Sequence, residues 1–475
     1  MTSFITGEDR SQSTLFPERL DDYIHEDNPV RVVDVFVDEL NFSELGFKRT
    51  VPSHTGCPAY APATMLKLYL YGYLNRIQSS RRLEREAQRN VELMWLTQRL
   101  TPSFKTIADF RKDNPKGIKN VCRTFIELCR QLNLFTEAVI AVDGSKFKAV
   151  NNSDRNYTKT NTKRRKEIVE KHIEKYLAKL DAADQDEETE DTASIKDKIA
   201  TLKSHLAQLE SIDATLTKGP EKQVSLTDPD CRAMKTQAIG RTIGYNVQTA
   251  VDTKNHIIVG HYVTNSVSDR GELSTIGKQA QDALGQKNIT VLADKGYYSG
   301  QEIKDCQDVG ITPLVPKTDT SGNKKKGLFT KEDFTYDAKK DVYICPANHE
   351  IPYSYATVEK GKTILGYLSV ITCRDCEIRS QCTTSNVRRI RRWEHEERLD
   401  KMEEKLQCNP KSMHLRKCTV EHPFGTIKSW MGATHFLTKR LPNVNTEMSL
   451  HVLAYNLKRV LNIIGQSALI EAIRA

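Results

Sequence analysis

Two short apolar runs that each end in an aspartate constrain the fold of this chain more than any other feature. Residues 138–142 lead into Asp143, and residues 288–293 lead into Asp294. Runs of this length and composition predict buried strands. A third carboxylate, Glu421, lies far along the chain in a basic segment that we expect to be helical. Two strand-end aspartates and a distant glutamate have the chemistry to hold a pair of divalent metal ions, which suits reactions at phosphodiesters.

Length and charge set wide limits. A chain of 475 residues is too long for one ordinary core, so roughly two to four structural units are expected. The net charge of +9 permits a nucleic-acid partner without requiring one. No stretch approaches the roughly 18 apolar residues that would cross a bilayer, and residues 7–10 interrupt any secretory signal. We therefore expect no membrane partner and a cytoplasmic protein. Its 11 cysteines should be reduced or bound to metal.

The first 135 residues have the pattern of a helical region. Helices are expected at Asn28-Pro29, at Pro62, from Ser79-Ser80 through Trp95, over 106–112 and over 115–132. The outer face of the third carries arginines: Arg81, Arg82, Arg85 and Arg89. Short helices with one arginine-rich face favour a helix-turn-helix DNA-binding region over 1–135. A plain helical bundle with a solvated charged face is the alternative.

Beyond residue 136 the order of predicted elements matches a ribonuclease-H-like fold. The strand ending at Asp143 precedes two strands, a helix, the strand ending at Asp294, a helix and a last strand near 311–315. Residues 146–150 are expected to form a neighbour of the first strand. In this fold the first and fourth strands lie side by side, so Asp143 and Asp294 should meet although 151 positions separate them. The predicted core covers 136–320 and 395–475 of a multi-domain α/β chain.

A charged stretch over 155–222 interrupts that core. Apolar residues recur there at helical spacing in two groups that flank an acidic run, residues 184–191. This pattern predicts an antiparallel helical-hairpin insertion. A solvated spacer and a contact surface for DNA or a partner are both open roles for it.

Four cysteines cluster in a segment with few other core-forming residues, 321–394. They are Cys345, Cys373, Cys376 and Cys382. The two-residue gap between Cys373 and Cys376 suits tetrahedral thiolate coordination of zinc, and a small domain short of apolar residues gains much of its stability from a metal. We predict a structural Zn²⁺ site in a small insertion, with His349 able to replace one cysteine. Four unrelated buried thiols are the alternative.

The segment around Glu421 joins an acidic residue to basic ones. Lys428 lies seven residues beyond Glu421, about two helical turns, so both side chains could lie on one helix face. Pro423 either opens a new helix or kinks a continuous one.

Four other aspartates are alternative ligands, but their local sequence favours structural roles. Asp252 precedes a turn, Asp228 and Asp230 flank a proline, and Asp269 is placed to cap the following helix. Lys295 and Tyr297 either position DNA or shape the loop after Asp294.

Four stretches carry a family resemblance. They are residues 142–146, 245–252, 293–297 and 421–428. In that order and spacing they resemble the motifs of DDE transposases of bacterial insertion sequences. Residues 62–114, the cysteine segment and residues 446–465 also resemble pieces of that family, so the likeness spans nearly the whole chain.

The resemblance implies that Asp143, Asp294 and Glu421 form a catalytic triad holding two Mg²⁺ (or Mn²⁺) ions. It also implies double-stranded DNA partners, both element ends and target, and a homodimer on paired ends. The same resemblance implies a bacterial, nucleoid-associated location. Lys428 matches a lysine that touches DNA phosphate in many relatives. The chain departs from the family where a tyrosine and an arginine often precede the glutamate, because His414 and Lys417 stand there. Arg416 and Lys417 are therefore expected to make only general phosphate contacts.

Three functions are compatible with these features. The first is a transposase that binds terminal inverted repeats, cleaves DNA with metal ions and transfers a strand. The second is a non-catalytic, domesticated DNA-binding relative. The third is a ribonuclease-H-like nuclease that cuts without strand transfer.

Overall fold

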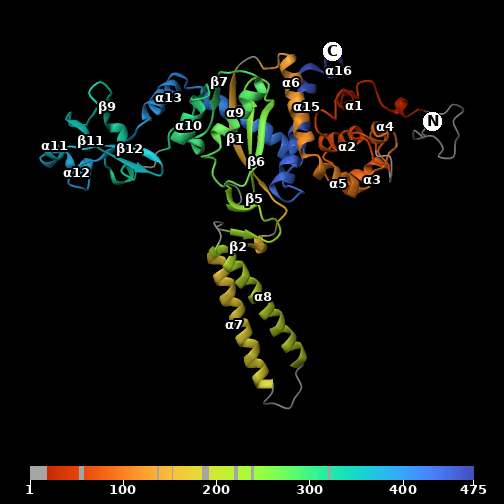
Figure 1. The fold of residues 1–475 in the computed structure, drawn as a ribbon, viewed down its shortest axis with the longest axis horizontal. Coiled ribbons are helices and arrows are strands. Elements are labelled where there is room, and N and C mark those ends of the chain that lie inside the picture. The colour runs from red at the N-terminus through yellow and green to blue at the C-terminus, as the bar shows by residue number, and fades with distance from the viewer. Residues whose placement is uncertain are drawn as a thin grey trace, which may run out of the picture.

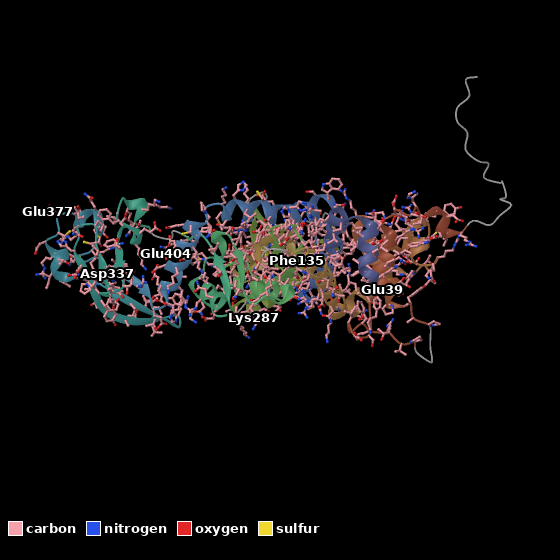
Figure 2. All side chains as sticks on the ribbon, turned by 90° about the horizontal axis from the view of Figure 1, so that it is seen from above. Glu39, Phe135, Lys287, Asp337, Glu377 and Glu404 are labelled. Carbon is pink, nitrogen blue, oxygen red and sulfur yellow. The ribbon has the colours of Figure 1, made fainter. Side chains whose placement is uncertain are left out.

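Three lobes lie in a row, and a long two-helix arm projects from the middle one (Figure 1). The computed structural model describes residues 19–52, 58–135, 138–151, 153–183, 192–218, 223–236, 240–318 and 322–475. The view from above shows Glu39 toward the N-terminal end of the row, Phe135 in the middle, and Asp337 and Glu377 toward the other end (Figure 2).

The N-terminal lobe is helical. Its helices are α1 (Val30–Asp38), α2 (Pro62–Leu74), α3 (Ser80–Ala87), α4 (Val91–Leu96), α5 (Phe104–Asp113) and α6 (Pro115–Gln131). The single helix expected from Ser79-Ser80 through Trp95 was wrong, because α3 and α4 are separate. Asn90 causes the break: its side chain accepts hydrogen bonds from the amides of Glu92 at 3.0 Å and Leu93 at 3.2 Å, and so caps α4.

The middle lobe is built on a six-stranded mixed sheet. Its strands run β4-β5-β1-β7-β8, with β6 also paired to β5. Their bounds are β1 (Val139–Lys148), β4 (Arg232–Thr236), β5 (Gly240–Asp252), β6 (Ile258–Thr264), β7 (Ile289–Leu292) and β8 (Ile311–Leu314). The neighbour strand expected over 146–150 was wrong, because β1 continues unbroken through Lys148 and pairs with β5 to that point.

Helices cover this sheet and join it to the N-terminal lobe. They are α9 (Leu273–Leu284), α10 (Gly300–Gln307), α14 (Ser412–Gly425), α15 (Leu441–Ile464) and α16 (Gln466–Arg474). Helix α15 packs against both α6 and β6. Phe125, Val251 and Leu453, from three distant parts of the sequence, are buried in one continuous hydrophobic core. The N-terminal helices and the sheet are therefore held together by a shared apolar core.

The arm is formed by α7 (Lys159–Ala183) and α8 (Thr192–Lys218), which pack side by side (Figure 1). Val169, Ile173 and Leu209 are buried between them. At the base of the arm, β2 (Asn156–Thr158) pairs antiparallel with β3 (Gln223–Ser225). The acidic run 184–191 lies outside the described residues.

The cysteine-rich lobe has a second sheet, β13-β12-β11-β10-β9. The strands are β9 (Thr335–Asp337), β10 (Val342–Ile344), β11 (Glu350–Glu359), β12 (Lys362–Tyr367) and β13 (Ile390–Trp393), with helices α11 (Val370–Arg374) and α12 (Arg379–Cys382) beside them. Its small core is rich in aromatic rings, among them Tyr343 and Tyr367 at 5.0 Å. Helix α13 (Glu396–Cys408) leads back to the middle lobe.

Among the described residues, no helix combines the length and the apolar character that a bilayer crossing requires.

Candidate active site

The sheet brings Asp143 and Asp294 side by side on two neighbouring strands. Strands β1 and β7 are parallel neighbours, and their register pairs Val139 with Thr290 and Ala141 with Leu292. Asp143 and Asp294 each stand two residues beyond the last of these pairs, at matching positions. Adjacent strands are about 4.8 Å apart, so the two carboxylates are neighbours.

The environment of Asp143 is confined and contains charges of both signs. Its side chain is 28% exposed. Burial raises the pKa of Asp143 to about 6, the nearby Arg416 opposes that rise, and the carboxylate of Asp294 adds to it. The electrostatic contribution of Asp294 agrees with the sheet register.

Arg416 is the direct partner of Asp143. Its Nη2 donates to Asp143 Oδ1 at 2.5 Å, and its Nε and Nη2 both lie 3.3 Å from the carbonyl oxygen of Val142. The arginine comes from α14, the helix that carries Glu421. Arg416 therefore does not face solvent as a general phosphate contact would, but joins α14 to the middle of β1.

Asp294 is oriented by the turn that follows it. Its Oδ1 accepts a hydrogen bond from the amide of Gly296 at 2.8 Å and caps the short helix η3 (Lys295–Tyr297). A Cβ at position 296 would lie 2.9 Å from that oxygen, so glycine allows this close approach. Tyr297 is buried, whereas Lys295 is exposed.

Glu421 is on the same helix as Arg416 but is not gathered with the two aspartates. Its side chain is 66% exposed, and its ion-pair partner is Lys417, itself 69% exposed, at 3.9 Å. Among the described residues, no three His, Cys, Asp or Glu side chains are placed to hold one metal ion. The structure thus brings together two of the three predicted ligands.

The residue after Glu421 fixes the far side of α14. His422 Nδ1 lies 2.9 Å from the Tyr455 hydroxyl, which donates to the carbonyl of His256 at 2.6 Å. The two histidine rings are 5.0 Å apart. Burial lowers the pKa of His422, and the positive charge of Arg459 lowers it further. A neutral His422 thus tethers α14 to α15.

Pro423 lies inside α14, which continues to Gly425 and then widens into the π-helical turn η6 (Thr426–Trp430). Of the two alternatives, a new helix opening at Pro423 is therefore wrong, and the proline lies inside a continuous helix. The turn directs Lys428 onto β1, where its Nζ donates to Ser145 Oγ at 2.6 Å and to the Lys146 carbonyl at 3.2 Å. Burial lowers the pKa of Lys428, and Asp143 opposes that effect. Its ammonium is close to the candidate site.

A polar cluster beside Gly144 was missed by the sequence reasoning. Asp269 Oδ1 accepts from Asn246 Nδ2 at 2.7 Å, from Gln248 Nε2 at 2.8 Å and from Lys146 Nζ at 3.2 Å. The expected helix-cap role of Asp269 was wrong, because Glu272 occupies the N-cap position of α9. Asn246 and Gln248 are fully buried on β5. Two polar residues at alternate positions of a buried strand were the signal that could have revealed the cluster.

The remaining carboxylates have structural roles. Asp228 Oδ1 accepts from the amide of Arg440 at 3.0 Å, and Asp230 Oδ2 accepts from the amide of Leu441 at 2.8 Å, so both hold the start of α15. Asp252 Oδ2 accepts from the amides of the turn residues Lys254 and Asn255. These bonds leave the paired carboxylates Asp143 and Asp294 as the candidate site.

The four clustered cysteines line one cavity of about 20 Å³, together with His349. All ten described cysteines are free thiols, and Cys57 lies outside the described residues. Burial raises the pKa of Cys382, and the other three thiols of the cavity contribute to the rise. The thiols thus face each other, although no three of them are within metal-holding distance among the described residues.

The predicted DNA-binding arginines are at the surface. Arg81, Arg82 and Arg85 on α3 are exposed, and the Arg81 guanidinium lies 5.0 Å from the centre of the Phe104 ring. This face is open to solvent.

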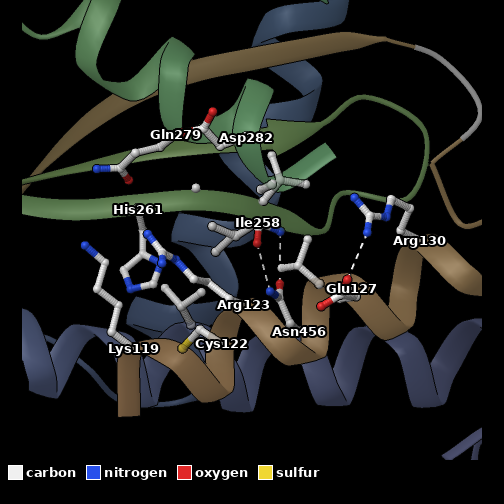
Figure 3. Close-up of a pocket in the computed structure, with 15 residues that line it drawn as sticks. Lys119, Cys122, Arg123, Glu127, Arg130, Ile258, His261, Gln279, Asp282 and Asn456 are labelled. Atoms are coloured by element: carbon white, nitrogen blue, oxygen red, sulfur yellow. Dashed lines mark hydrogen bonds and ion pairs between the residues drawn. The ribbon is translucent and has the colours of Figure 1, made fainter. Parts of the chain in front are cut away.

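A separate cavity of about 360 Å³ lies where the N-terminal lobe meets the sheet, between α6, β6, α9 and α15 (Figure 3). Two of its polar contacts lie within the protein: Asn456 bonds both the amide and the carbonyl of Ile258, and Arg130 pairs with Glu127 at 3.0 Å. Asp143, Asp294 and Glu421 are not part of its lining. This cavity belongs to the junction between lobes.

Comparison with known proteins places the chain in a family. Residues 207–457, just over half of the chain, match the model of the Transposase DDE domain, and residues 18–113 match that of a Transposase domain (DUF772). The sheet, the paired aspartates and these matches define a DDE-type transposase. The chain belongs to this family, in its insertion-sequence type. The matched DDE region contains Asp294 and Glu421 and begins after Asp143.

One solved structure is similar over most of the chain: the cryo-EM structure of the piggyBac transposase synaptic complex with hairpin DNA. It is 9% identical, with a TM-score of 0.32 over 94% of this chain and 79% of that one. No curated protein matches the sequence.

Proposed function

We propose that this protein is an active DNA transposase that binds the terminal inverted repeats of its insertion sequence, cleaves the DNA ends and transfers the freed strand to target DNA. The observation that carries the proposal is the register between β1 and β7, which sets Asp143 beside Asp294. Paired carboxylates on neighbouring strands are oxygen ligands suited to Mg²⁺ or Mn²⁺.

Asp143 and Asp294 are the residues that would hold the ions, with Glu421 as the third ligand. When bound, two divalent ions activate the attacking oxygen and stabilise the leaving oxygen at phosphorus. The buried position of Asp143 limits its motion, and the Gly296 amide fixes one oxygen of Asp294. Lys428, held against β1, supplies positive charge beside the reacting phosphate.

Glu421 joins this pair through a rearrangement at α14. Its exposed side chain has only the long contact to Lys417 to break, whereas Arg416 must release Asp143. DNA phosphate is a suitable alternative partner for the Arg416 guanidinium. We therefore propose that bound DNA draws Arg416 away from Asp143, so that a metal ion can take the place of the arginine at this carboxylate.

The lobes divide the remaining tasks. Residues 1–135 would bind double-stranded DNA through Arg81, Arg82 and Arg85, and Arg416 and Lys417 would contact phosphates nearer the catalytic core, residues 136–320 and 395–475. The arm within 155–222 and the cysteine-rich segment 321–394 are insertions into that core. Holding two element ends together calls for two copies of the chain, so the active species is a homodimer on DNA.

Cys345, Cys373, Cys376 and Cys382 would hold a structural Zn²⁺. Their shared cavity and free thiol state support the assignment. Purified protein should contain one zinc per chain by elemental analysis, and Cys373→Ser should lose it. The matched control Cys408→Ser, at an exposed cysteine outside the cavity, should keep it. Zinc-free wild-type protein that folds normally would reject the site.

The function is tested with DNA that carries the terminal repeats flanking the gene. Labelled end DNA, a target plasmid and Mg²⁺ are incubated with the protein, and joined products are resolved on a gel. Joining that disappears in Asp143→Asn supports the transposase. Cleavage without joining would instead identify a nuclease, and binding without cleavage would identify a non-catalytic relative.

A further inference from the structure

A buried hydrogen-bond chain lies behind the candidate active site, on the face of the sheet that α9 covers. It runs from Tyr297 through Gln248 to Asp269. Gln248 is fully buried on β5, and its register partner on β1 is Gly144. The chain therefore joins the strand pair β1–β5 to η3, the short helix that follows β7.

Tyr297 anchors the turn that carries Asp294. The pairing of β7 with β1 ends at Leu292, two residues before Asp294, so side chains have to hold the turn against β1. The side chain of Tyr297 is 1% exposed, and its hydroxyl donates to Gln248 Oε1 at 2.5 Å. Burial raises the pKa of Tyr297 well above its usual value, and the carboxylate of Asp269 adds to the rise. The hydroxyl therefore keeps its proton and acts as a donor.

Gln248 is held in one orientation by the carboxylate of Asp269. Its Nε2 donates to Asp269 Oδ1 at 2.8 Å. Only the nitrogen of an amide can donate to a carboxylate, so this bond directs the amide oxygen at Tyr297. Asn246 Nδ2 and Lys146 Nζ donate to the same Asp269 oxygen at 2.7 and 3.2 Å and hold it in place.

The chain packs directly against the backbone of β1 beside Asp143. A Cβ at position 144 would lie 2.5 Å from both Asp269 Oδ1 and Gln248 Nε2, so glycine leaves the room that these side chains occupy. Successive side chains of a strand point to opposite faces, so the carboxylate of Asp143 lies on the other face of the sheet. The chain therefore acts on that carboxylate through the backbone and not by contact.

We propose that Gln248 and Tyr297 are positioning residues that set the separation between Asp143 and Asp294. Gln248 pairs with β1 at the residue after Asp143, and Tyr297 stands three residues beyond Asp294. Their hydrogen bond holds the turn against the strand pair, so the two carboxylates keep one spacing before metal binds. A fixed spacing favours metal binding, because less conformational freedom is lost when the ions arrive. The inference rests on the proposed function only for the role of the two aspartates as metal ligands.

The test is Mn²⁺ binding to the DNA-free protein, measured by calorimetry. Tyr297→Phe removes one hydroxyl and should lower the affinity for Mn²⁺ about tenfold, as the loss of a group that orients a metal ligand does. Tyr262→Phe is the matched control, because the Tyr262 hydroxyl donates to Glu272 Oε2 at 2.6 Å beside the same core. This control should bind Mn²⁺ as the wild type does. Unchanged affinity in Tyr297→Phe, or an equal loss in both variants, would overturn the proposal.

A double-mutant cycle separates the hydrogen bond from packing. Gln248→Met keeps a side chain of similar length without the amide, and it should lower the Mn²⁺ affinity at least as much as Tyr297→Phe. The double variant should lose no more affinity than Gln248→Met alone, because the two residues act through one bond. Losses that multiply in the double variant would show independent effects and would overturn the proposed coupling.

Hydrogen exchange of the turn gives a measurement that needs no metal. The amides of residues 294–297 should exchange about tenfold faster in Tyr297→Phe than in the wild type, and at the wild-type rate in Tyr262→Phe. Unchanged exchange in Tyr297→Phe would show that the hydroxyl does not anchor the turn.

Failure of the proposed function has a different signature. If the wild type binds Mn²⁺ yet cleaves no DNA, the proposed function is rejected and the positioning of the two aspartates stands. If the wild type cleaves DNA and Tyr297→Phe keeps its Mn²⁺ affinity, the positioning role alone is rejected. A wild type that binds no Mn²⁺ without DNA would reject the preset spacing of the two carboxylates.

Discussion

The candidate ligands on the sheet and the one on the helix are held in different ways. Asp143 is mostly buried within strand β1, next to Asp294 across a fixed register, whereas Glu421 is 66% exposed on α14. Backbone pairing positions the first two before any ligand arrives. The position of the third depends on how α14 sits against β1, and Arg416 now sets that contact. Two candidate ligands are therefore placed together by the sheet, and Glu421 would join them in the proposed site only after α14 adjusts.

The largest effect is expected at the sheet. Asp143→Asn should reduce the rate of DNA cleavage about a thousandfold or more, because it removes a charged candidate ligand of the metal ions. A thousandfold loss of rate corresponds to several kcal/mol of transition-state stabilisation, which is what bound metal ions supply. DNA binding should remain. Cleavage rates on labelled end DNA give the measurement, with the exposed Glu377→Gln as the control. A loss below tenfold would remove Asp143 from the catalytic site.

A smaller effect is expected at the helix. Glu421→Gln should lower cleavage about a hundredfold, since Asp143 and Asp294 still retain most of the metal ligands. The rate should recover partly at high Mn²⁺ concentration, which would not happen for Asp143→Asn. Equal losses of rate in Asp143→Asn and Glu421→Gln would contradict the distinction between the ligands on the sheet and the ligand on the helix. Wild-type activity of Glu421→Gln would exclude Glu421 from the catalytic site.

Low pH should weaken metal binding at Asp143. Because the pKa of Asp143 is raised to about 6, protons compete with metal below that value, and Mn²⁺ affinity should fall about tenfold per pH unit. For folding the sign is opposite: the folded state favours the protonated carboxyl, so the contribution of Asp143 to stability falls as pH rises from about 4 to 6. Titrating Mn²⁺ into DNA-free protein at several pH values tests this. A flat profile in wild type, or the same profile in Asp143→Asn, would contradict it.

The smallest effect concerns the contact between helix and sheet. Arg416→Met should raise the affinity of the DNA-free protein for Mn²⁺ about three- to tenfold, because it removes a cation that competes for Asp143. Lys405→Met is the matched control, since this exposed lysine lies on α13 and not on α14. Calorimetric titration measures both. Unchanged affinity in Arg416→Met would show that the arginine does not oppose metal binding.

Local patterns predicted the strands and their order well because buried strands and turns leave strong signals. The apolar run before Asp143 and the matching run before Asp294 became neighbouring strands as expected. The pattern failed where a capping side chain competes with helix continuation, as at Asn90, and where a strand continues past polar residues, as at Ser145 and Lys146. In both places two local backbone conformations differ little in free energy, so the sequence pattern does not show which one forms.

The sequence by itself determined the family and the order of elements. That order makes Asp143 and Asp294 neighbours. Only the tertiary structure decided that Arg416 pairs with Asp143, that Asp269 joins a buried polar cluster and that Glu421 stands apart. The reason is physical. Strand register follows from local hydrophobic periodicity, whereas the side-chain partners across α14 and β1 depend on packing between segments more than 270 residues apart.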